Sequence, residues 1–217
     1  MAYDFDKIAR DYDRMNHLMT LGLDRGWRRR AVRDLKGKVL DVACGTGDMV
    51  ELLANQGCEV TGVDISGEML SRAKNKAPSA MYLVADAEDL PFANESFDTV
   101  TCAFGVRNFV HLEKGLEEML RVLKPGGRMV ILELATPDSL LIRPFYKLYT
   151  SRIIPWLGQH IADSREAYTY LPQSIERFPK GKAFCAIVEK CGGKAAERRF
   201  TCGVCRRYVI EKQRGRD

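Results

Sequence analysis

The sequence predicts an α/β fold with a doubly wound, mostly parallel sheet of seven strands, N-terminal helices and an inserted helical cap. From Lys38 onwards, short apolar runs rich in β-branched residues alternate with segments of helical spacing, which is typical of parallel strands joined by helices. Polar and glycine-rich motifs follow these runs, and such folds bind ligands beyond the carboxyl ends of their strands. The 217 residues contain no linker, repeat or low-complexity tract, so we expect one domain over residues 1–217.

The chain divides into four successive parts. Residues 5–34 predict N-terminal helices, residues 38–136 the core, residues 137–179 the cap, and residues 180–211 a final helix and a β-hairpin that closes the sheet. The expected strands are residues 38–43, 58–65, 81–85, 97–103, 128–134, 195–201 and 204–211. The expected helices of the core are residues 48–57, 67–76 and 112–123. The breaker KPGG, Lys124 to Gly127, predicts a turn after the last of these helices.

Composition and charge limit the location and the partners of the chain. With 46% hydrophobic residues it can bury a core without disulfides, and its seven cysteines are scattered through apolar segments, which indicates a reducing compartment. No run approaches the roughly 18 apolar residues of a membrane span, and the N-terminus lacks a signal-peptide pattern. We therefore expect a cytoplasmic protein. The net charge of +5 fits an ordinary solvated surface, with an anionic membrane surface or nucleic acid as alternatives.

The segment LDVACGTGDMV, Leu40 to Val50, predicts a nucleotide-type cofactor loop between a strand and a helix. Gly45 and Gly47 match the first two glycines of a dinucleotide motif, but Val50 stands where the third glycine belongs. Asp41 and Asp48 would also place negative charge where a pyrophosphate rests. The loop therefore favours a cofactor without phosphates and with cationic groups, namely S-adenosyl-L-methionine, which leaves as S-adenosyl-L-homocysteine.

Aspartates at further strand ends support this cofactor. Asp64 ends the second strand 19 positions after Gly45, where a carboxylate can accept both ribose hydroxyls. Asp86 and Ala87 end the third strand, where a carboxylate and a backbone amide can hold the adenine edge. Each aspartate alone could equally form a strand-end turn or a helix cap. Together with the KPGG turn, the set indicates a class I S-adenosylmethionine-dependent methyltransferase and leaves the methyl acceptor open.

Longer motifs resemble the menaquinone and ubiquinone biosynthesis C-methyltransferase family over nearly the whole chain. The motifs that carry the resemblance are FDKIARDYDRMNHLMTLGLDRGWRR, LDVACGTGD, ADAEDLPFANESFD, AFGVRNF, EMLRVLKPGG, IIPWLGQHIAD and YTYLPQSIERFP. The resemblance implies methyl transfer to a ring carbon of a polyprenylated quinol, giving menaquinone or a ubiquinone precursor. It also implies that the cofactor contacts Gly45, Thr46, Gly47, Asp64, Asp86 and Ala87. Ala103 stands where some members have serine, and the segment FTCGVCRRYVIEK fits the family only loosely.

Arg107 and Asn108 are the predicted catalytic residues. An aromatic carbon becomes nucleophilic when its quinol hydroxyl loses a proton, and a phenol has a pKa near 10. Arg107 stays protonated, so it can stabilise a phenolate but cannot act as the base. Asn108 is expected to orient the second oxygen or a water. A structural alternative for the pair is a salt bridge plus a helix cap.

The cap and the N-terminal helices are expected to bind the substrate. The predicted contacts are Tyr12, Asn16, Tyr168 and Tyr170, with the cap tyrosines Tyr146, Tyr149, Tyr168 and Tyr170 divided between cap core and pocket lining. The general base is left open among Tyr12, His17, Asp163, Tyr168 and a water held by Arg107. Cys202 and Cys205 form a C-x-x-C without a second pair at zinc spacing, so we expect no metal.

Two other interpretations of the function, and several partners, follow from these observations. The chain could methylate another acceptor, such as a small metabolite, a sterol or nucleic acid, or it could bind S-adenosylmethionine as a non-catalytic scaffold. No basic stripe interleaved with aromatic residues is present, which argues against nucleic acid. A polyprenyl quinol lies in the bilayer, so we expect transient contact with an anionic membrane surface, on the inner face, without a span. A homodimer is left open.

Overall fold

The computed structural model describes residues 12–153 and 165–213, without the side chains of Tyr12, Met15, Leu18 and residues 165–169. Seven strands form one sheet in the order β3-β2-β1-β4-β5-β7-β6. The first five strands are parallel, whereas β7 runs antiparallel to both of its neighbours. The predicted doubly wound, mostly parallel seven-stranded sheet is therefore confirmed.

The elements lie close to the predicted ranges. The strands are β1 Lys38–Val42, β2 Glu59–Asp64, β3 Met81–Val84, β4 Phe97–Ala103, β5 Leu123–Leu134, β6 Gly193–Phe200 and β7 Cys205–Lys212. The α-helices are α1 Tyr12–Met19, α2 Leu23–Val32, α3 Asp48–Asn55, α4 Gly67–Lys76, α5 Leu112–Val122, α6 Arg143–Leu148, α8 Arg165–Arg177 and α9 Lys182–Lys190. Short turns of other helix types are η2 Val106–Asn108, η3 Tyr149–Ile153 and η4 Thr201–Gly203.

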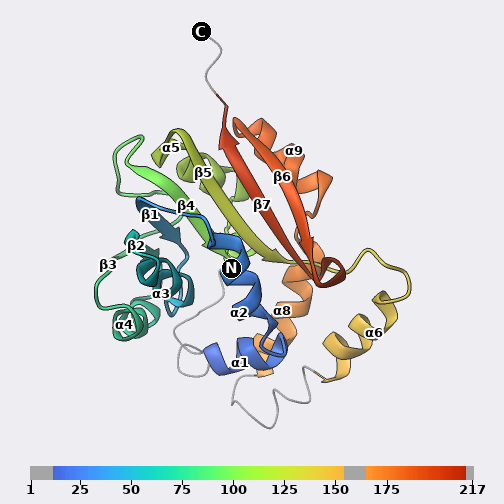
Figure 1. The fold of residues 1–217 in the computed structure, drawn as a ribbon. Coiled ribbons are helices and arrows are strands. Elements are labelled where there is room, and N and C mark those ends of the chain that lie inside the picture. The colour runs from blue at the N-terminus through green and yellow to red at the C-terminus, as the bar shows by residue number, and fades with distance from the viewer. Residues whose placement is uncertain (1–11, 154–164, 214–217) are drawn as a thin grey trace.

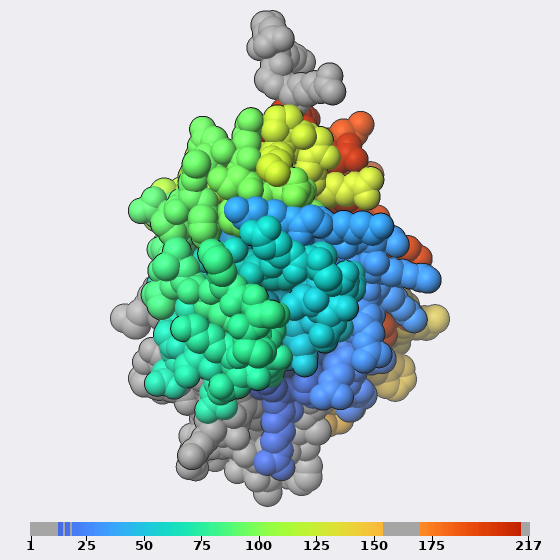
Figure 2. Space-filling view, turned by 60° about the vertical axis from the view of Figure 1, so that its left-hand side comes forward, coloured from blue at the N-terminus to red at the C-terminus, as the bar shows by residue number. Residues whose placement is uncertain are grey.

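Helices cover both faces of the sheet, as the apolar strands require. One buried cluster joins the sheet to α5 and α9, through residues such as Leu116, Met119 and Phe184. The other joins it to α2, α3 and α4, through residues such as Trp27 and Leu53. Figure 2 shows α2 in blue, α3 in cyan and α4 in blue-green side by side across this second face. In Figure 1, α1, α6 and α8 lie together beyond one end of the sheet.

The segment KPGG, predicted as a turn between helix and strand, lies inside β5. Phe97 of β4 pairs with Leu123 and Thr99 pairs with Arg128. Four residues on β5, 124–127, therefore stand against one residue on β4, and the three additional residues bulge out of the ladder. Gly126, with φ of 77°, takes the left-handed conformation that such a bulge requires. The breaker residues interrupt the pairing locally while the strand begins earlier than predicted.

Gly47 fixes the position of α3 and hence of the loop before it. Its φ is 86°, and a Cβ at this position would lie 2.8 Å from the Cβ of Ala73 in α4. Only glycine combines this backbone conformation with so close an approach of two helices. The N-terminus of α3 is thereby held against α4, at the edge where β1 and β2 end.

Candidate active site

A hollow of about 820 Å³, which we call the strand-end hollow, lies beyond the carboxyl ends of β1, β2, β3 and β4. Parallel strands present their carboxyl ends at one edge, so the loops that follow them converge there. The lining residues are Ala43, Gly45, Asp64, Ile65, Met69, Ala85, Asp86, Ala87, Glu88, Phe104, Gly105, Asn108, Phe109 and Val110. Five of the predicted site residues, namely Gly45, Asp64, Asp86, Ala87 and Asn108, thus meet at one place.

Asp64 ties the β1 loop to the end of β2. Its Oδ2 accepts the backbone N–H of Gly45 at 2.8 Å, and its Oδ1 accepts the N–H of Ser66 at 2.9 Å. The residue is 8% exposed. Two non-glycine residues of the lining, Ala43 and Phe104, have φ of 52° and 61°. Such left-handed conformations after β1 and β4 are costly and are concentrated at functional sites.

The β3 loop forms the opposite wall of the strand-end hollow. Asp86 Oδ1 accepts the N–H of Glu88 at 2.9 Å, which closes a local turn. Glu88 is 8% exposed, and its Oε1 accepts the N–H of His111 at 2.7 Å, so this turn is bound to the start of α5. Ile65 and Met69 add apolar surface to the same hollow. The wall therefore combines a carboxylate with space for a flat apolar group.

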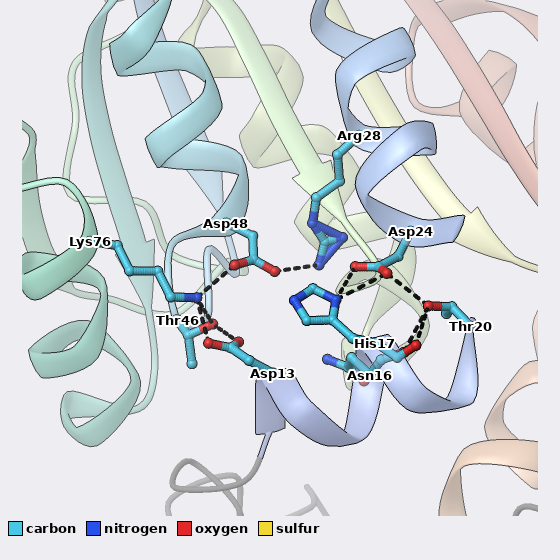
Figure 3. A network of polar contacts seen from close by, with 9 residues as sticks. All are labelled: Asp13, Asn16, His17, Thr20, Asp24, Arg28, Thr46, Asp48 and Lys76. Carbon is cyan, nitrogen blue, oxygen red and sulfur yellow. Dashed lines mark hydrogen bonds and ion pairs between the residues drawn. The ribbon is translucent and has the colours of Figure 1, made fainter. Parts of the chain in front are cut away.

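Thr46 and Gly47 lie outside the lining of this hollow and support its loop from behind. Thr46 Oγ1 donates to Asp13 of α1 and accepts from Lys76 Nζ at 3.2 Å. Lys76 also pairs with Asp13 at 2.5 Å and with Asp48 at 2.6 Å. These partners raise the pKa of Lys76 in spite of its burial. The network ties α1, α3 and α4 to one another beside the glycine loop (Figure 3).

His17, a candidate base, belongs to the same network. Its Nδ1 lies 2.9 Å from Asp24 Oδ2, and Asp24 is 1% exposed and also accepts from Thr20 Oγ1 at 2.8 Å. Ligand atoms of His17, Asp24 and Asp48 lie within 4.8 Å of one another, as in a metal site. Arg28 already lies 3.6 Å from Asp48, and its positive charge disfavours a bound cation there.

Arg107 forms a buried ion pair. Its Nη1 donates to Glu133 Oε1 at 2.7 Å, and the two side chains are 6% and 1% exposed. The same nitrogen donates to the carbonyl oxygen of Phe104. Arg107 lines a separate hollow of about 630 Å³, the Arg107 hollow, together with Phe109, Tyr170 and other residues of α8. The salt bridge that the structural alternative for Arg107 predicted is thus present. Phe109 lines both the Arg107 hollow and the strand-end hollow.

Asn108 connects the strand-end hollow to the cap. Its Oδ1 accepts the hydroxyl hydrogen of Tyr170, from α8, at 2.9 Å. Because the side-chain oxygen is used in this way, the amide nitrogen is the group that Asn108 can offer to a ligand. Burial raises the pKa of Tyr170, while the charge of Arg107 opposes this shift, so the hydroxyl stays a donor at neutral pH.

A third hollow, the apolar hollow, lies between the N-terminal helices and the cap. It measures about 770 Å³ and is lined by Asn16, Met19, Thr20, Leu21, Leu23, Trp27, Leu134, Tyr146, Tyr149, Thr150, Leu171, Pro172, Ile175, Thr201 and Val204. Asn16 lies here, not at the strand-end hollow. Burial raises the pKa of Tyr146 to about 12. Asp163 and the side chains of Tyr12 and Tyr168 lie outside the described part of the chain.

Comparison with known proteins identifies the family. Residues 2–212 match the ubiE/COQ5 methyltransferase family. The chain belongs to this family. A demethylmenaquinone methyltransferase of Bacteroides fragilis is 40% identical over 96% of this chain and 90% of its own length. A ubiquinone/menaquinone biosynthesis C-methyltransferase of Geotalea daltonii is 42% identical over 96% of this chain and 94% of its own.

Solved structures agree on the fold. A SAM-dependent methyltransferase from Aquifex aeolicus has a TM-score of 0.64 at 17% identity, over 91% of this chain and 97% of its own. A phosphoethanolamine N-methyltransferase of Haemonchus contortus, solved with S-adenosylhomocysteine, has a TM-score of 0.61 at 17% identity, over 88% of this chain and 52% of its own. These likenesses show the class I methyltransferase fold. The predicted family, enzyme class and cofactor are therefore confirmed.

The strand-end hollow of this ubiE/COQ5 methyltransferase fits S-adenosylmethionine. Its carboxylates, Asp64, Asp86 and Glu88, suit a ligand with a sulfonium and an amino group, and its apolar part suits an adenine ring. Among the described helices, none is both long enough and apolar enough to cross a bilayer.

Two lining residues, Ile65 and Phe104, and the partner of Arg107, Glu133, were missed by the sequence-based prediction. Ile65 directly follows Asp64, and Phe104 directly follows β4, so strand-end position alone pointed to them. Glu133 carried a different signal, since it is a lone acid within the apolar run VILEL. A buried acid in a strand requires a partner, and here the partner is Arg107.

The carboxyl group of Asp41 is the titratable group beneath this site. Burial raises its pKa to about 7, while a hydrogen bond from Thr101 and the charge of Arg28 act in the opposite direction. Thr101 Oγ1 donates to Asp41 Oδ1 at 2.6 Å. A raised folded-state pKa means that the folded chain binds more protons than the unfolded chain between pH 4 and 7. The contribution of Asp41 to stability therefore falls as the pH rises through this window.

Asp41→Asn tests this assignment, because the amide keeps the acceptor for Thr101 and cannot ionise. The free energy of unfolding of the variant, relative to the native chain, is expected to rise by about 4 kcal/mol from pH 4 to pH 7. Urea denaturation across this pH range measures the difference. Glu59→Gln, which removes an exposed carboxylate at the other end of the sheet, serves as the control for net charge. A difference that does not vary with pH would contradict a raised pKa at Asp41.

Proposed function

We propose that the chain transfers a methyl group from S-adenosylmethionine to a ring carbon of a polyprenylated quinol, with demethylmenaquinol as the acceptor. The relatives at about 40% identity that cover nearly the whole chain carry names with this substrate. The apolar hollow between α1, α2, α6 and α8 carries the proposal, because a polyprenyl chain needs a long apolar surface of this kind. One relative's name includes ubiquinone, so a benzoquinol precursor is the second acceptor.

The proposed cofactor contacts are those at the strand-end hollow. Asp64 accepts the ribose hydroxyls, and Asp86 and Ala87 meet the adenine edge. Gly45 allows the close approach of the methionyl portion. Thr46 and Gly47 act on the loop conformation, through Lys76 and Ala73, in place of direct contact.

The reaction forms a bond between a ring carbon and the methyl carbon and breaks the bond between that methyl carbon and sulfur. S-adenosylmethionine supplies the electrophilic methyl group on its sulfonium. The quinol loses one proton, and the products are the methylated quinol and S-adenosylhomocysteine. The protein must therefore hold the ring in line with the methyl group and stabilise negative charge on the quinol oxygen.

Asn108 is the proposed donor to that oxygen. Its side-chain oxygen accepts the Tyr170 hydroxyl, so the amide N–H groups are the donors that Asn108 offers at the strand-end hollow, which it lines. Tyr170 thereby positions the side chain of Asn108. The helix that carries Tyr170, α8, also contributes Leu171 and Pro172 to the apolar hollow. A quinol whose ring lies at Asn108 and whose polyprenyl tail lies in the apolar hollow would contact both sides of α8.

Arg107 is proposed to stabilise the phenolate through its charge. Burial raises the pKa of Tyr146 and Tyr170, and the charge of Arg107 opposes that rise, as a positive charge near a phenol does. Its ion pair with Glu133 reduces this field and holds the guanidinium beneath the Phe104 carbonyl. The base remains open between His17, whose Nδ1 is bound to Asp24, and groups outside the described residues.

The cap offers a surface for the membrane. Leu140 and Leu141, just before α6, and Phe145 in its first turn are 78%, 83% and 75% exposed. Arg143 and Lys147 of the same segment are also exposed. The other face of the same segment carries Tyr146, Tyr149 and Thr150 of the apolar hollow. We propose that the exposed face rests on an anionic bilayer, from which the tail of the quinol enters the hollow.

The proposed activity is tested by offering both reduced demethylated quinols with methyl-labelled S-adenosylmethionine. Label is expected in the naphthoquinol product, and the oxidised quinone should accept none, because its ring carbon lacks the electron density of a phenolate. Binding of S-adenosylmethionine without transfer to either quinol would favour the scaffold reading. Preferential transfer to an unrelated acceptor would contradict the substrate.

Variants of the ion pair separate the catalytic from the structural role of Arg107. Arg107→Met leaves Glu133 buried and unpaired, so we expect a loss of about 3–5 kcal/mol in the free energy of unfolding together with lost turnover. Arg107→Met combined with Glu133→Met removes both charges and should recover most of the stability. Thermal denaturation and methyl transfer are measured on both variants. The phenolate role requires turnover to stay low in the double variant, and recovery of turnover with stability would contradict it.

Membrane contact is tested with Leu141→Glu combined with Phe145→Glu. Co-sedimentation with vesicles of phosphatidylglycerol and phosphatidylcholine should fall on the order of 10- to 100-fold, because two apolar side chains can no longer enter the bilayer. Met81→Glu alters another exposed apolar residue, on β3, which is 65% exposed, and this variant should bind as the native chain does. Binding that does not depend on anionic lipid would contradict the electrostatic part.

A further inference from the structure

The two ends of the cap meet at one cluster of charged side chains, which we call the cap clamp and which consists of Asp138, Lys180, Glu197 and Arg206. Asp138 lies between β5 and α6, and Lys180 lies between α8 and α9. Glu197 and Arg206 belong to β6 and β7, the last two strands of the chain. The cap clamp therefore joins both ends of the cap to the C-terminal hairpin.

Arg206 is the centre of the cap clamp. It is 2% exposed, and its two terminal nitrogens reach different acids, because Nη2 donates to Asp138 Oδ2 at 2.6 Å and Nη1 donates to Glu197. Gly181, which follows Lys180, has φ of 60°, and a Cβ there would lie 3.1 Å from Arg206 Nη1. The returning end of the cap thus packs directly against the guanidinium. A planar guanidinium with two carboxylate acceptors has a fixed orientation.

Further contacts bind the two ends of the cap to each other. Lys180 Nζ donates to the carbonyl oxygen of Thr136 at 2.7 Å and lies 3.6 Å from Asp138 Oδ1. Arg199 Nη1 lies 3.3 Å from Asp138 Oδ2. Burial alone would raise the pKa of Asp138, but the hydrogen bond from Arg206 and the charges of the other cations lower it. The carboxylate is therefore ionised at neutral pH and is shared by three cations.

The segment that follows Asp138 depends on such contacts, because α6 and η3 contain no buried residue. Packing against the core therefore does not fix their position. The hydroxyl group of Tyr149 donates to the carbonyl oxygen of Met19 at 3.1 Å, and the cap clamp holds the other end of the segment. The end of α8 differs, since Phe178 lies in a buried cluster with Phe184, at 5.3 Å between ring centres. The cap clamp thus matters most for α6.

The segment of α6 and η3 forms a wall of the apolar hollow. It contributes Tyr146, Tyr149 and Thr150, and α8 contributes Leu171 and Pro172. Apolar groups are in contact only when their atoms approach within about 4.5 Å, so a bound tail requires these walls at a fixed separation. The lining of the strand-end hollow, in contrast, includes no residue of α6 or η3. A change in the position of α6 should therefore affect the tail and not the cofactor.

We propose that Asp138, held by Arg206, is a positioning residue that fixes α6 at the apolar hollow and thereby determines how tightly the enzyme binds the apolar tail of its acceptor. The inference rests on the quinol acceptor of the proposed function and assigns a role to the C-terminal hairpin. Asp138 contacts neither the ring nor the cofactor. Its effect on turnover should therefore depend on the presence of a tail.

The test uses Asp138→Asn, which removes the charge and keeps the size of the side chain. The kcat/KM is measured for a polyprenylated demethylated naphthoquinol and for the same quinol without a tail. The ratio of the two values should fall about 3- to 10-fold, with the KM of S-adenosylmethionine unchanged. An unchanged ratio, or an equal rise in the KM of S-adenosylmethionine, would overturn the proposal.

Asp98→Asn is the matched control. Asp98 accepts from Lys124 Nζ at 2.7 Å at the opposite end of the sheet, and its side chain is 44% exposed, against 39% for Asp138. This variant loses a similar ion pair but should keep the native preference for the tailed quinol. A fall in the ratio as large as that of Asp138→Asn would show a general loss of stability and would overturn the proposal.

A double-mutant cycle tests whether Asp138 acts through Arg206. Arg206→Lys keeps the charge, but a single ammonium group cannot reproduce the two separate bonds of the guanidinium. The ratio should fall severalfold in Arg206→Lys as well. The variant that combines both substitutions should fall little further than the more affected single variant, because both remove the same interaction. Additive losses would contradict a role of Asp138 through Arg206.

Hydrogen–deuterium exchange tests the cap clamp without any acceptor. The amides of residues 139–153 should exchange about 3- to 10-fold faster in Asp138→Asn than in the native chain, whereas those of α3 should exchange at the native rate. Unchanged exchange over residues 139–153 would overturn the proposal even if quinols are methylated. If no quinol accepts a methyl group from the native chain, the proposed function fails, and the exchange rates still decide whether Asp138 positions α6.

Discussion

The carboxylate of Asp64 is the interaction on which the site depends. It accepts backbone N–H groups from Gly45 and Ser66, and thus joins the loop after β1 to the turn after β2. Ser66 in turn caps α4 by accepting the N–H of Met69 at 3.1 Å. A single buried side chain therefore fixes the glycine loop, the end of its own strand and the start of a helix, which together form one wall of the strand-end hollow.

The acidic and the basic side chains around this wall occupy different places. Acidic groups at the ends of β2 and β3 face the hollow, whereas Arg28, Lys76 and Arg107 lie behind the loops and are each bound to an acid. Such an arrangement favours a ligand with a cationic centre in the strand-end hollow. The polar groups occur where the strands end, and the apolar hollow lies on the other side of α8, toward α6.

The sequence was informative wherever a residue's position along a strand decided its role. Asp64 and Asp86 were expected at this edge, and both line the strand-end hollow, because a short apolar run followed by polar or turn residues marks where a buried parallel strand ends. Thr46 and Arg107 could not be placed in the same way, since their partners Asp13, Lys76 and Glu133 are distant in the chain and meet only through packing. The segment KPGG was likewise predicted as a simple turn. It lies inside β5 because Leu123 pairs with Phe97 of β4, and such a contact between distant residues is not visible in the local sequence.

The central claim is that the methyl group is transferred at the junction of the strand-end hollow and α8, between Asp64 and Asn108. The most direct measurement is a crystal structure of the chain with S-adenosylhomocysteine and a short-tailed demethylated naphthoquinol. We expect the ribose against Asp64, the sulfur directed to Asn108, and the tail within the apolar hollow. A ring bound away from Asn108, or a cofactor bound outside the strand-end hollow, would contradict this account.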